Sequence, residues 1–283
     1  MAKKRGSVGQ VLAAAVVAGV VFVFGVLMLQ SRAVESTVQF DPETNCQLNR
    51  QLQGHLVVLI DVTDGLAPEL AEEITADLRG PLARMRGGEK LTIALVDDTS
   101  NSVVSAAVTA CSPPRGLEAS VLTSNSTMIE RKWQKEFADP VLARVAALAT
   151  DREVSRSGIV QSIQRISELP DFGNESGVPR QELVIYSDWL ENQIFQSAQE
   201  TLPRNLVSQL SARLETLAGV AVKPTTLVRT KRQPEQDRAE RVFMEAFASS
   251  GTSMETPRRI CCLVPRSDGT TAGAVGVGAS RYP

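Results

Sequence analysis

The chain has 283 residues, of which 43% are hydrophobic and 22% are charged, and its formal net charge is −2. This length and composition allow one good-sized domain with appendages. The near-neutral charge argues against a nucleic-acid-binding protein, which normally carries a basic face, so no nucleic-acid partner is expected.

The N-terminal region predicts a membrane anchor. Residues 11–29 contain no charged residue and no amide, and a helix of that length, at about 1.5 Å per residue, just spans the hydrocarbon core. Basic residues precede this run (Lys3, Lys4 and Arg5), and only Arg32 follows it closely. The positive-inside rule therefore predicts a single-pass inner (plasma) membrane protein, with residues 1–10 cytoplasmic and the main domain periplasmic or extracellular, most simply in a bacterial periplasm.

A cleaved signal peptide is the alternative to the anchor. The sequence Ser31-Arg32-Ala33 resembles a cleavage site, although the apolar run is longer than the usual apolar region of about 7–15 residues. The choice between an anchor and a cleaved peptide stays open. Residues 30–54 are expected to form a polar lead-in to the main domain.

The first half of the main domain contains strands and one helix. "HLVVLID", residues 55–61, is an apolar run that predicts a buried strand, and a helix over 67–79 follows, opened by Pro68. Strands are predicted at 91–96 and 103–110, and the turn residues "DDTSNS" between them indicate an antiparallel pair.

The second half alternates helices with strands. Thr127 and Glu130 have the spacing of a capping box ahead of a long helix, which Pro140 must kink or interrupt. "ELVIYSD" predicts another buried strand, which ends at Asp188. The remaining expected elements are helices at 158–169, 204–217 and 235–249 and a strand at 220–229.

This order of elements predicts an α/β fold with a doubly wound, mostly parallel sheet and an antiparallel edge strand, preceded by one transmembrane helix. The domain is expected to cover residues 55–265. Residues 266–283 are mostly small residues that cannot bury a core, so they are expected to form a flexible tail.

The scarcity of histidine limits the chemistry. His55 is the only histidine, and the four cysteines form no C-x-x-C pair, so a zinc site has too few plausible ligands. With a single histidine, most active sites of the Ser-His and Cys-His type are also excluded. We interpret His55 as an ordinary residue at the start of a strand and predict that the protein is not an enzyme.

Two strands end in an aspartate, and here the chain resembles the von Willebrand factor type A (vWA) domain family. That family's metal-ion-dependent adhesion site begins D-x-S-x-S; this chain has Asp61-Val62-Thr63-Asp64-Gly65, then Ser157 where the family has a threonine, then Asp188. The resemblance implies that the two strands lie side by side. It also implies that Asp61, Thr63, Ser157 and Asp188 bind Mg²⁺ or Ca²⁺. Gly65 replaces the second serine, so one hydroxyl ligand is missing and the site is degenerate.

Several alternatives to a metal site remain open. "DVTDG" is also a good strand-to-helix turn, in which Asp and Thr side chains satisfy backbone amides. We expect a membrane-anchored, extracytoplasmic vWA-like module that binds another protein; the alternative is a metal-free structural scaffold of a membrane complex. A Rossmann-like hydrolase is less favoured, because Thr63 stands where the D-x-D signature of aspartyl-phosphate hydrolases has its acid/base carboxylate.

The resemblance also leads to a predicted disulfide. If the second strand runs parallel to the first, as the family resemblance implies, the third strand ends at the amino-end side of the sheet. Cys46 precedes the first strand and Cys111 follows the third, so both thiols lie at that side, about two strand spacings or 10 Å apart. The lead-in or the turn after Cys111 must then fold across to join them. Cys261 and Cys262 are expected to be free or intermolecular.

Overall fold

The computed structural model describes residues 16–28, 39–63, 66–96, 106–119, 124–150, 158–190 and 205–261. Several predictions therefore lie wholly or partly outside the described residues. They include the cytoplasmic segment 1–10, the ends of the apolar run, the first part of the lead-in, Asp64 and Gly65, the turn at 97–102, the predicted ligand Ser157, Cys262 and the tail at 266–283.

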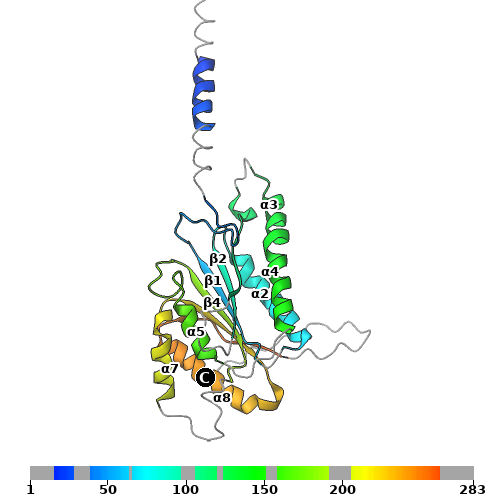
Figure 1. Ribbon diagram of the computed structural model, residues 1–283, viewed down its shortest axis with the longest axis vertical. Helices are drawn as coiled ribbons and strands as arrows, with labels where there is room; N and C mark the ends of the chain where they lie inside the picture. Colours follow the sequence, from blue (N-terminus) through cyan, green and yellow to red (C-terminus); the bar gives the residue numbers. More distant parts are fainter. Residues whose placement is uncertain are drawn as a thin grey trace, which may run out of the picture.

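A mostly parallel sheet forms the centre of the domain (Figure 1). Its strand order is β3-β2-β1-β4-β5-β6, with β7 also paired to β5, and only the β2–β3 pair is antiparallel. The predicted doubly wound sheet with an antiparallel edge is thus confirmed. The strands are β1 (His55–Ile60), β2 (Lys90–Leu95), β3 (Ala106–Cys111), β4 (Gln181–Ser187), β5 (Ala221–Leu227), β6 (Ser253–Met254) and β7 (Arg258–Ile260).

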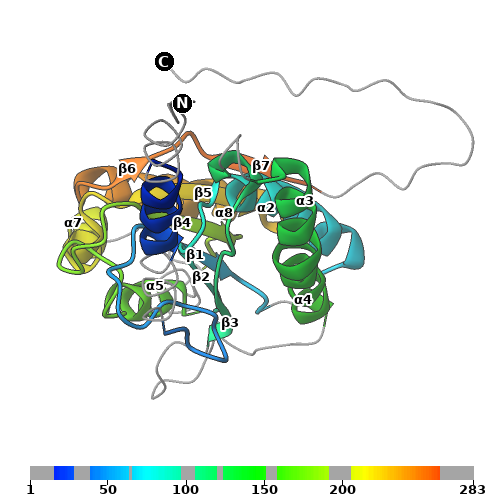
Figure 2. The ribbon, with the colours of Figure 1, turned by 90° about the horizontal axis from the view of Figure 1, so that it is seen from above.

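Helices cover both faces of the sheet, as Figure 2 shows from above. Alternate residues of β1 point to opposite faces: Val58 and Ile60 belong to one apolar core, Val57 and Leu59 to the other. Burial on both faces explains why the strand is apolar without interruption. On the first face lie α2 (Pro68–Arg84), α3 (Ser126–Trp133) and α4 (Asp139–Thr150); on the second lie α5 (Ile159–Ser167), α7 (Leu206–Leu214) and α8 (Gln233–Ser249).

The helix predicted to end at 79 continues to Arg84, with Pro81 inside it. The reason is tertiary: Leu78 and Leu82 are both buried and extend the apolar face of α2 past the proline. Carbonyl oxygens at the end of the helix find a hydrogen-bond donor outside it. The buried guanidinium of Arg115 donates to the carbonyl oxygens of Leu82, Ala83 and Met85.

The start of the long helix also differs from the prediction. Asn125, not Thr127, is the N-cap residue, and its side chain accepts a hydrogen bond from the backbone N–H of Met128. Glu130, the predicted second residue of the capping box, instead forms an ion pair of 2.6 Å with Arg115. The expected interruption near Pro140 is present as a π-helical turn, Gln134–Ala138, which joins α3 to α4.

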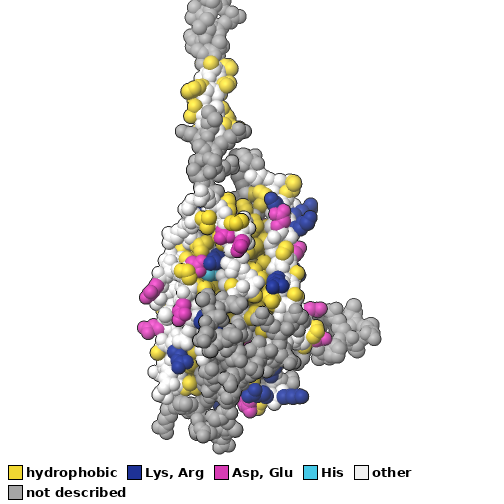
Figure 3. Space-filling view, in the orientation of Figure 1, with side chains coloured by type: hydrophobic (Ala, Val, Ile, Leu, Met, Phe, Trp, Pro, Cys, Tyr) yellow, Lys and Arg dark blue, Asp and Glu magenta, His cyan; other side chains and the backbone are white. Residues whose placement is uncertain are grey.

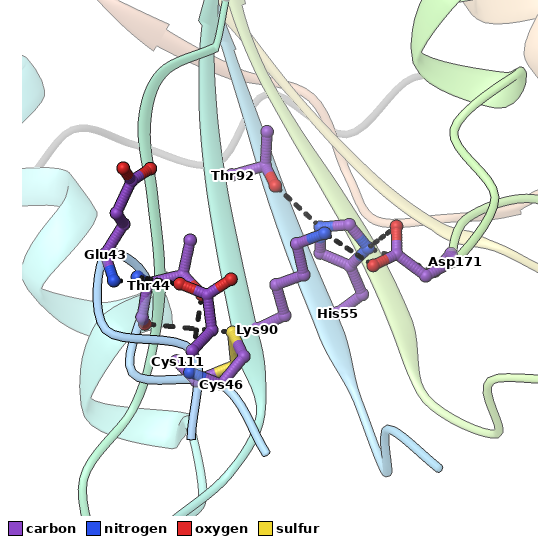
Figure 4. The surroundings of a disulfide bond; sticks show 9 residues. Glu43, Thr44, Cys46, His55, Lys90, Thr92, Cys111 and Asp171 are labelled. Carbon is purple, nitrogen blue, oxygen red and sulfur yellow. Dashed lines mark hydrogen bonds and ion pairs between the residues drawn. A yellow bond between two sulfur atoms is a disulfide. The ribbon is translucent and has the colours of Figure 1, made fainter. Parts of the chain in front are cut away.

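The lead-in is fastened to the edge of the sheet by the predicted disulfide, Cys46–Cys111, which is confirmed (Figure 4). The lead-in folds across, as the distance argument required, and brings the two Cα atoms to 4.9 Å. The backbone N–H of Cys111 also donates to the carbonyl oxygen of Thr44 at 2.7 Å. The described part of the lead-in is therefore part of the folded domain rather than a loose tether.

Residues 16–28, within the predicted anchor, are helical, and their side chains are exposed. No helix within the described ranges is both long and apolar enough to span a membrane.

Candidate functional site

Asp61 and Asp188 come together at the carboxyl end of two adjacent parallel strands. β1 and β4 are neighbours, with Ile60 opposite Tyr186, and the N–H of Asp61 donates to the carbonyl oxygen of Tyr186 at 2.8 Å. The strands' side-by-side arrangement, which the vWA resemblance implied, is confirmed. We call the group formed by Asp61, Thr63, Asp188 and Arg229 the rim.

Asp61 is buried and held by hydroxyl groups. Its Oδ1 atom accepts hydrogen bonds from the hydroxyl of Thr63 at 2.7 Å and from the Thr63 N–H at 3.2 Å. Its Oδ2 atom accepts from the hydroxyl of Ser187 at 2.9 Å. Burial raises the pKa of Asp61, and these hydrogen bonds and the charge of Arg229 only partly oppose that shift.

Asp188 is paired with an arginine. Its Oδ1 atom accepts from the N–H of Leu190 at 2.9 Å, and its Oδ2 atom accepts from the Nε–H of Arg229 at 3.2 Å. The Asp188 side chain is only 4% exposed, whereas that of Arg229 is 26% exposed. The guanidinium thus approaches the buried carboxylate from the solvent side of the domain.

Gln236 fixes the position of this arginine. Its Oε1 atom accepts from the backbone N–H of Arg229 at 2.9 Å, while its amide group donates to the carbonyl oxygens of Leu227 and Asp188. The buried glutamine therefore links the first turn of α8 to the ends of β4 and β5. It holds the backbone of Arg229 close to that of Asp188.

The residue after Asp188 has an unusual backbone conformation. Trp189 has φ of 63°, in the left-handed region that bulky residues rarely adopt. Its indole is fully buried, packs against Phe243 and Phe247, and donates to the hydroxyl of Thr226 at 2.8 Å. The indole therefore belongs to the core, where it packs over α8, and does not present an exposed surface.

The rim residues do not fit a divalent cation in this arrangement. Such a cation needs about six oxygen ligands. Here the hydroxyl of Thr63 is turned to Asp61 as a donor, and Asp188 already has a positive partner in Arg229. Nor do the described residues contain a group of three His, Cys, Asp or Glu side chains suited to a metal. Because Ser157 lies outside the described residues, the four-residue site of Asp61, Thr63, Ser157 and Asp188 stays a prediction.

A second polar cluster lies at the opposite, amino end of the sheet (Figure 4). One ring nitrogen of His55 lies 3.3 Å from the carboxylate of Asp171, and the other lies 2.8 Å from the hydroxyl of Thr92. Lys90 pairs with the same carboxylate at 2.6 Å. This order of hydroxyl, imidazole and carboxylate resembles a catalytic triad, but Thr92 and His55 are each only 2% exposed. The arrangement fits a structural role.

Sequence reasoning did not identify Arg229, Gln236 or Asp171. Arg229 lies 41 positions from Asp188, and Asp171 lies 116 positions from His55. The available indication for Arg229 was its place at the end of the strand predicted at 220–229. No spacing pattern links any of these residues to its partner.

Neither a protein-family model nor a curated protein sequence matches this chain. Solved structures similar to it include BatB, a conserved hypothetical protein from Bacteroides thetaiotaomicron (10% identity, 74% of this chain and 90% of that one, TM-score 0.40). An aerotolerance-related membrane protein from Bacteroides fragilis gives 10% identity, 73% and 90% coverage and a TM-score of 0.36. The PilB minor pilin from Streptococcus sanguinis, as a D319A mutant, gives 6% identity, 78% and 59% coverage and a TM-score of 0.40. Likeness at this level carries no functional argument, so the fold assignment rests on the strand order.

Proposed function

We propose that this chain is a membrane-anchored, extracytoplasmic vWA-like module that binds another protein at the rim. The observation that carries the proposal is the position of Asp61 and Asp188. The chain leaves β1 toward β2 on one side, and β4 and β5 lie on the other, so the β1–β4 boundary is the switch point of the sheet. Doubly wound folds hold their ligands outside the carboxyl ends of strands at such a point.

Two features support the anchored, exported location. The helical residues 16–28 expose only hydrophobic and small uncharged side chains, as Figure 3 shows, among them Phe22 at 73% and Phe24 at 64% exposure. A structural disulfide also fits an oxidising compartment outside the cytoplasm. A reporter active only outside the cytoplasm and fused after Pro283 should therefore be active; a cytoplasmic reporter would contradict export.

The rim geometry does not favour the expected binding of Mg²⁺ or Ca²⁺. The ion pair between Asp188 and Arg229 supports the metal-free alternative, in which the same edge binds a partner or acts as a scaffold without an ion. A hydrolase is less favoured still, because the hydroxyl of Thr63 is hydrogen-bonded to Asp61 where a carboxylate would be needed to move a proton.

Site-specific photo-crosslinking of the full chain in cells tests the rim as an interface. A photoreactive amino acid replaces Arg232, whose side chain is 47% exposed just beyond β5, or, as the control, Leu117, which is 89% exposed just beyond β3. We expect a discrete crosslinked band from position 232 and not from position 117. A band from position 117 alone would show that the partner binds at the other end of the sheet.

A further inference from the structure

Arg229 lies where a rim cation would be needed. Two buried carboxylates, Asp61 and Asp188, stand at the ends of adjacent strands, and buried carboxylates need compensating positive charge or hydrogen bonds. Asp61 is compensated by hydroxyl and N–H donors, as described above. Asp188 accepts hydrogen bonds from the N–H of Leu190 and from the Nε–H of Arg229.

The guanidinium is a fixed charge in a fixed place. Arginine side chains are positively charged in proteins, so Arg229 brings a positive charge to the buried carboxylate. Its backbone is held by Gln236, which is 1% exposed and bonded to the ends of both neighbouring strands. A divalent ion on Asp188 would have to displace this arginine or bear its repulsion at close range.

We propose that the guanidinium of Arg229 is the permanent cation of the rim, taking the place that a divalent ion has in the metal-binding members of the resembled family. The rim is accordingly complete without Mg²⁺ or Ca²⁺, and Arg229 is the residue that excludes them. This inference concerns the unbound protein and holds whether or not a partner binds there.

Calorimetry and thermal unfolding of the full chain in detergent, with Mg²⁺ or Ca²⁺ as the probe, test the proposal. The wild type should bind neither ion saturably and should unfold at the same temperature with cation or chelator. Arg229→Met keeps most of the hydrocarbon stem and removes the charge, so it should gain a saturable cation response. At a cation concentration about 100 times the dissociation constant, its folded-to-unfolded ratio should rise about 100-fold.

Two further variants make the result specific to charge. Arg229→Lys retains a positive charge and should remain insensitive to both ions, whereas Arg229→Gln is a second neutral variant and should behave as Arg229→Met does. Saturable binding by the wild type would overturn the proposal, and so would neutral variants that respond no more than the wild type. Either result would leave crosslinking from position 232 unchanged, so failure here is distinguishable from failure of the proposed interface.

Discussion

At the amino end of the sheet, His55, Lys90 and Asp171 form one paired cluster beside the disulfide; at the carboxyl end, the charge of Arg229 acts on two buried carboxylates. The two ends also differ in how well the residue with a left-handed backbone suits that conformation. Asn45, next to the disulfide, has φ of 57°, and asparagine tolerates this left-handed conformation. Trp189 at the rim has φ of 63°, and a bulky residue adopts it at a cost of about 1–3 kcal/mol.

The two ends of the sheet therefore serve different purposes. The amino end combines a covalent link, ion pairs and a residue suited to its conformation, which all favour stability. The carboxyl end retains buried charge and backbone strain, features that persist where the surrounding structure supports them and that cluster at functional sites. Substitutions at the two ends should therefore differ in their effect on stability.

The largest effect is expected from loss of the disulfide. The bridge spans a sequence separation of 65, and in the chain-entropy model a loop of that length stabilises by about 4 kcal/mol. The Cys46→Ser/Cys111→Ser variant should lose about that much in urea unfolding. The rate of amide hydrogen exchange should rise more at the lead-in and β3 than at the rim. An equal rise at both ends would show that the disulfide does not stabilise the amino end in particular.

A smaller effect is expected from Arg229→Met. It leaves Asp188 buried without its positive partner and should cost about 2 kcal/mol, below the roughly 3–5 kcal/mol of a fully buried pair because Arg229 retains contact with solvent. The double variant Asp188→Asn/Arg229→Met should recover part of this loss in the same unfolding measurement. No recovery would mean that the single variant acts through lost packing.

The dependence of stability on pH should have opposite signs at the two ends. Burial alone would raise the pKa of Asp171, but His55 and Lys90 hold it well below its usual value of 3.8. Its contribution is therefore present above that pH and is lost as the pH falls. Asp171→Asn should cost about 1.5 kcal/mol near neutral pH, as for a hydrogen bond to a charged group, and little in strong acid.

For Asp61 the sign is reversed. Its pKa is raised, so ionising it in the folded state costs stability progressively as the pH rises above 3.8. Relative to the wild type, Asp61→Asn should become more favourable as the pH rises, while Asp171→Asn becomes less favourable. Parallel pH profiles of unfolding for the two variants would show that the two ends are not electrostatically distinct.

The smallest effect is expected from replacing the two tryptophans with phenylalanine. Trp189→Phe removes the donor to Thr226 and should cost about 1 kcal/mol. Trp133→Phe is the matched control near the other end: it removes a hydrogen bond to Ser112 and replaces the indole beneath Arg115, whose ring centre lies 3.7 Å from the guanidinium carbon, with a smaller phenyl ring. Trp133→Phe should cost at least as much; the reverse order in urea unfolding would place the greater stability at the rim.

The fold could be predicted because its determinants are local and repeated. Uninterrupted apolar runs such as Leu56 to Ile60 predicted buried strands, and helices between them predicted parallel pairing. The short strands β6 and β7 were not predicted, since segments of two and three residues carry no measurable periodicity. The end of the helix predicted at 79 was wrong, because tertiary burial of Leu82 outweighs the cost of Pro81 in the helix.

The site was predictable only in part. Strand ends place Asp61 and Asp188 together, and the family resemblance identified both. The partner of Asp188 could not be predicted, because an ion pair between β4 and the end of β5 depends on side-chain directions that no sequence spacing encodes. The contact between His55 and Asp171 could not be predicted either, because the two residues are far apart in the sequence and only the fold brings them together.

The disulfide also sets a route for mechanical force. Tension pulling on the chain from the N-terminal side reaches Cys46 before it reaches the sheet, and there the covalent path divides. One branch continues to β1 at the centre, and the other crosses the sulfur bridge to the end of β3 at the edge, with β2 lying between them. A load between the proposed membrane anchor and the proposed partner at the rim would thus be shared by two strands of the sheet, instead of being applied to β1 alone.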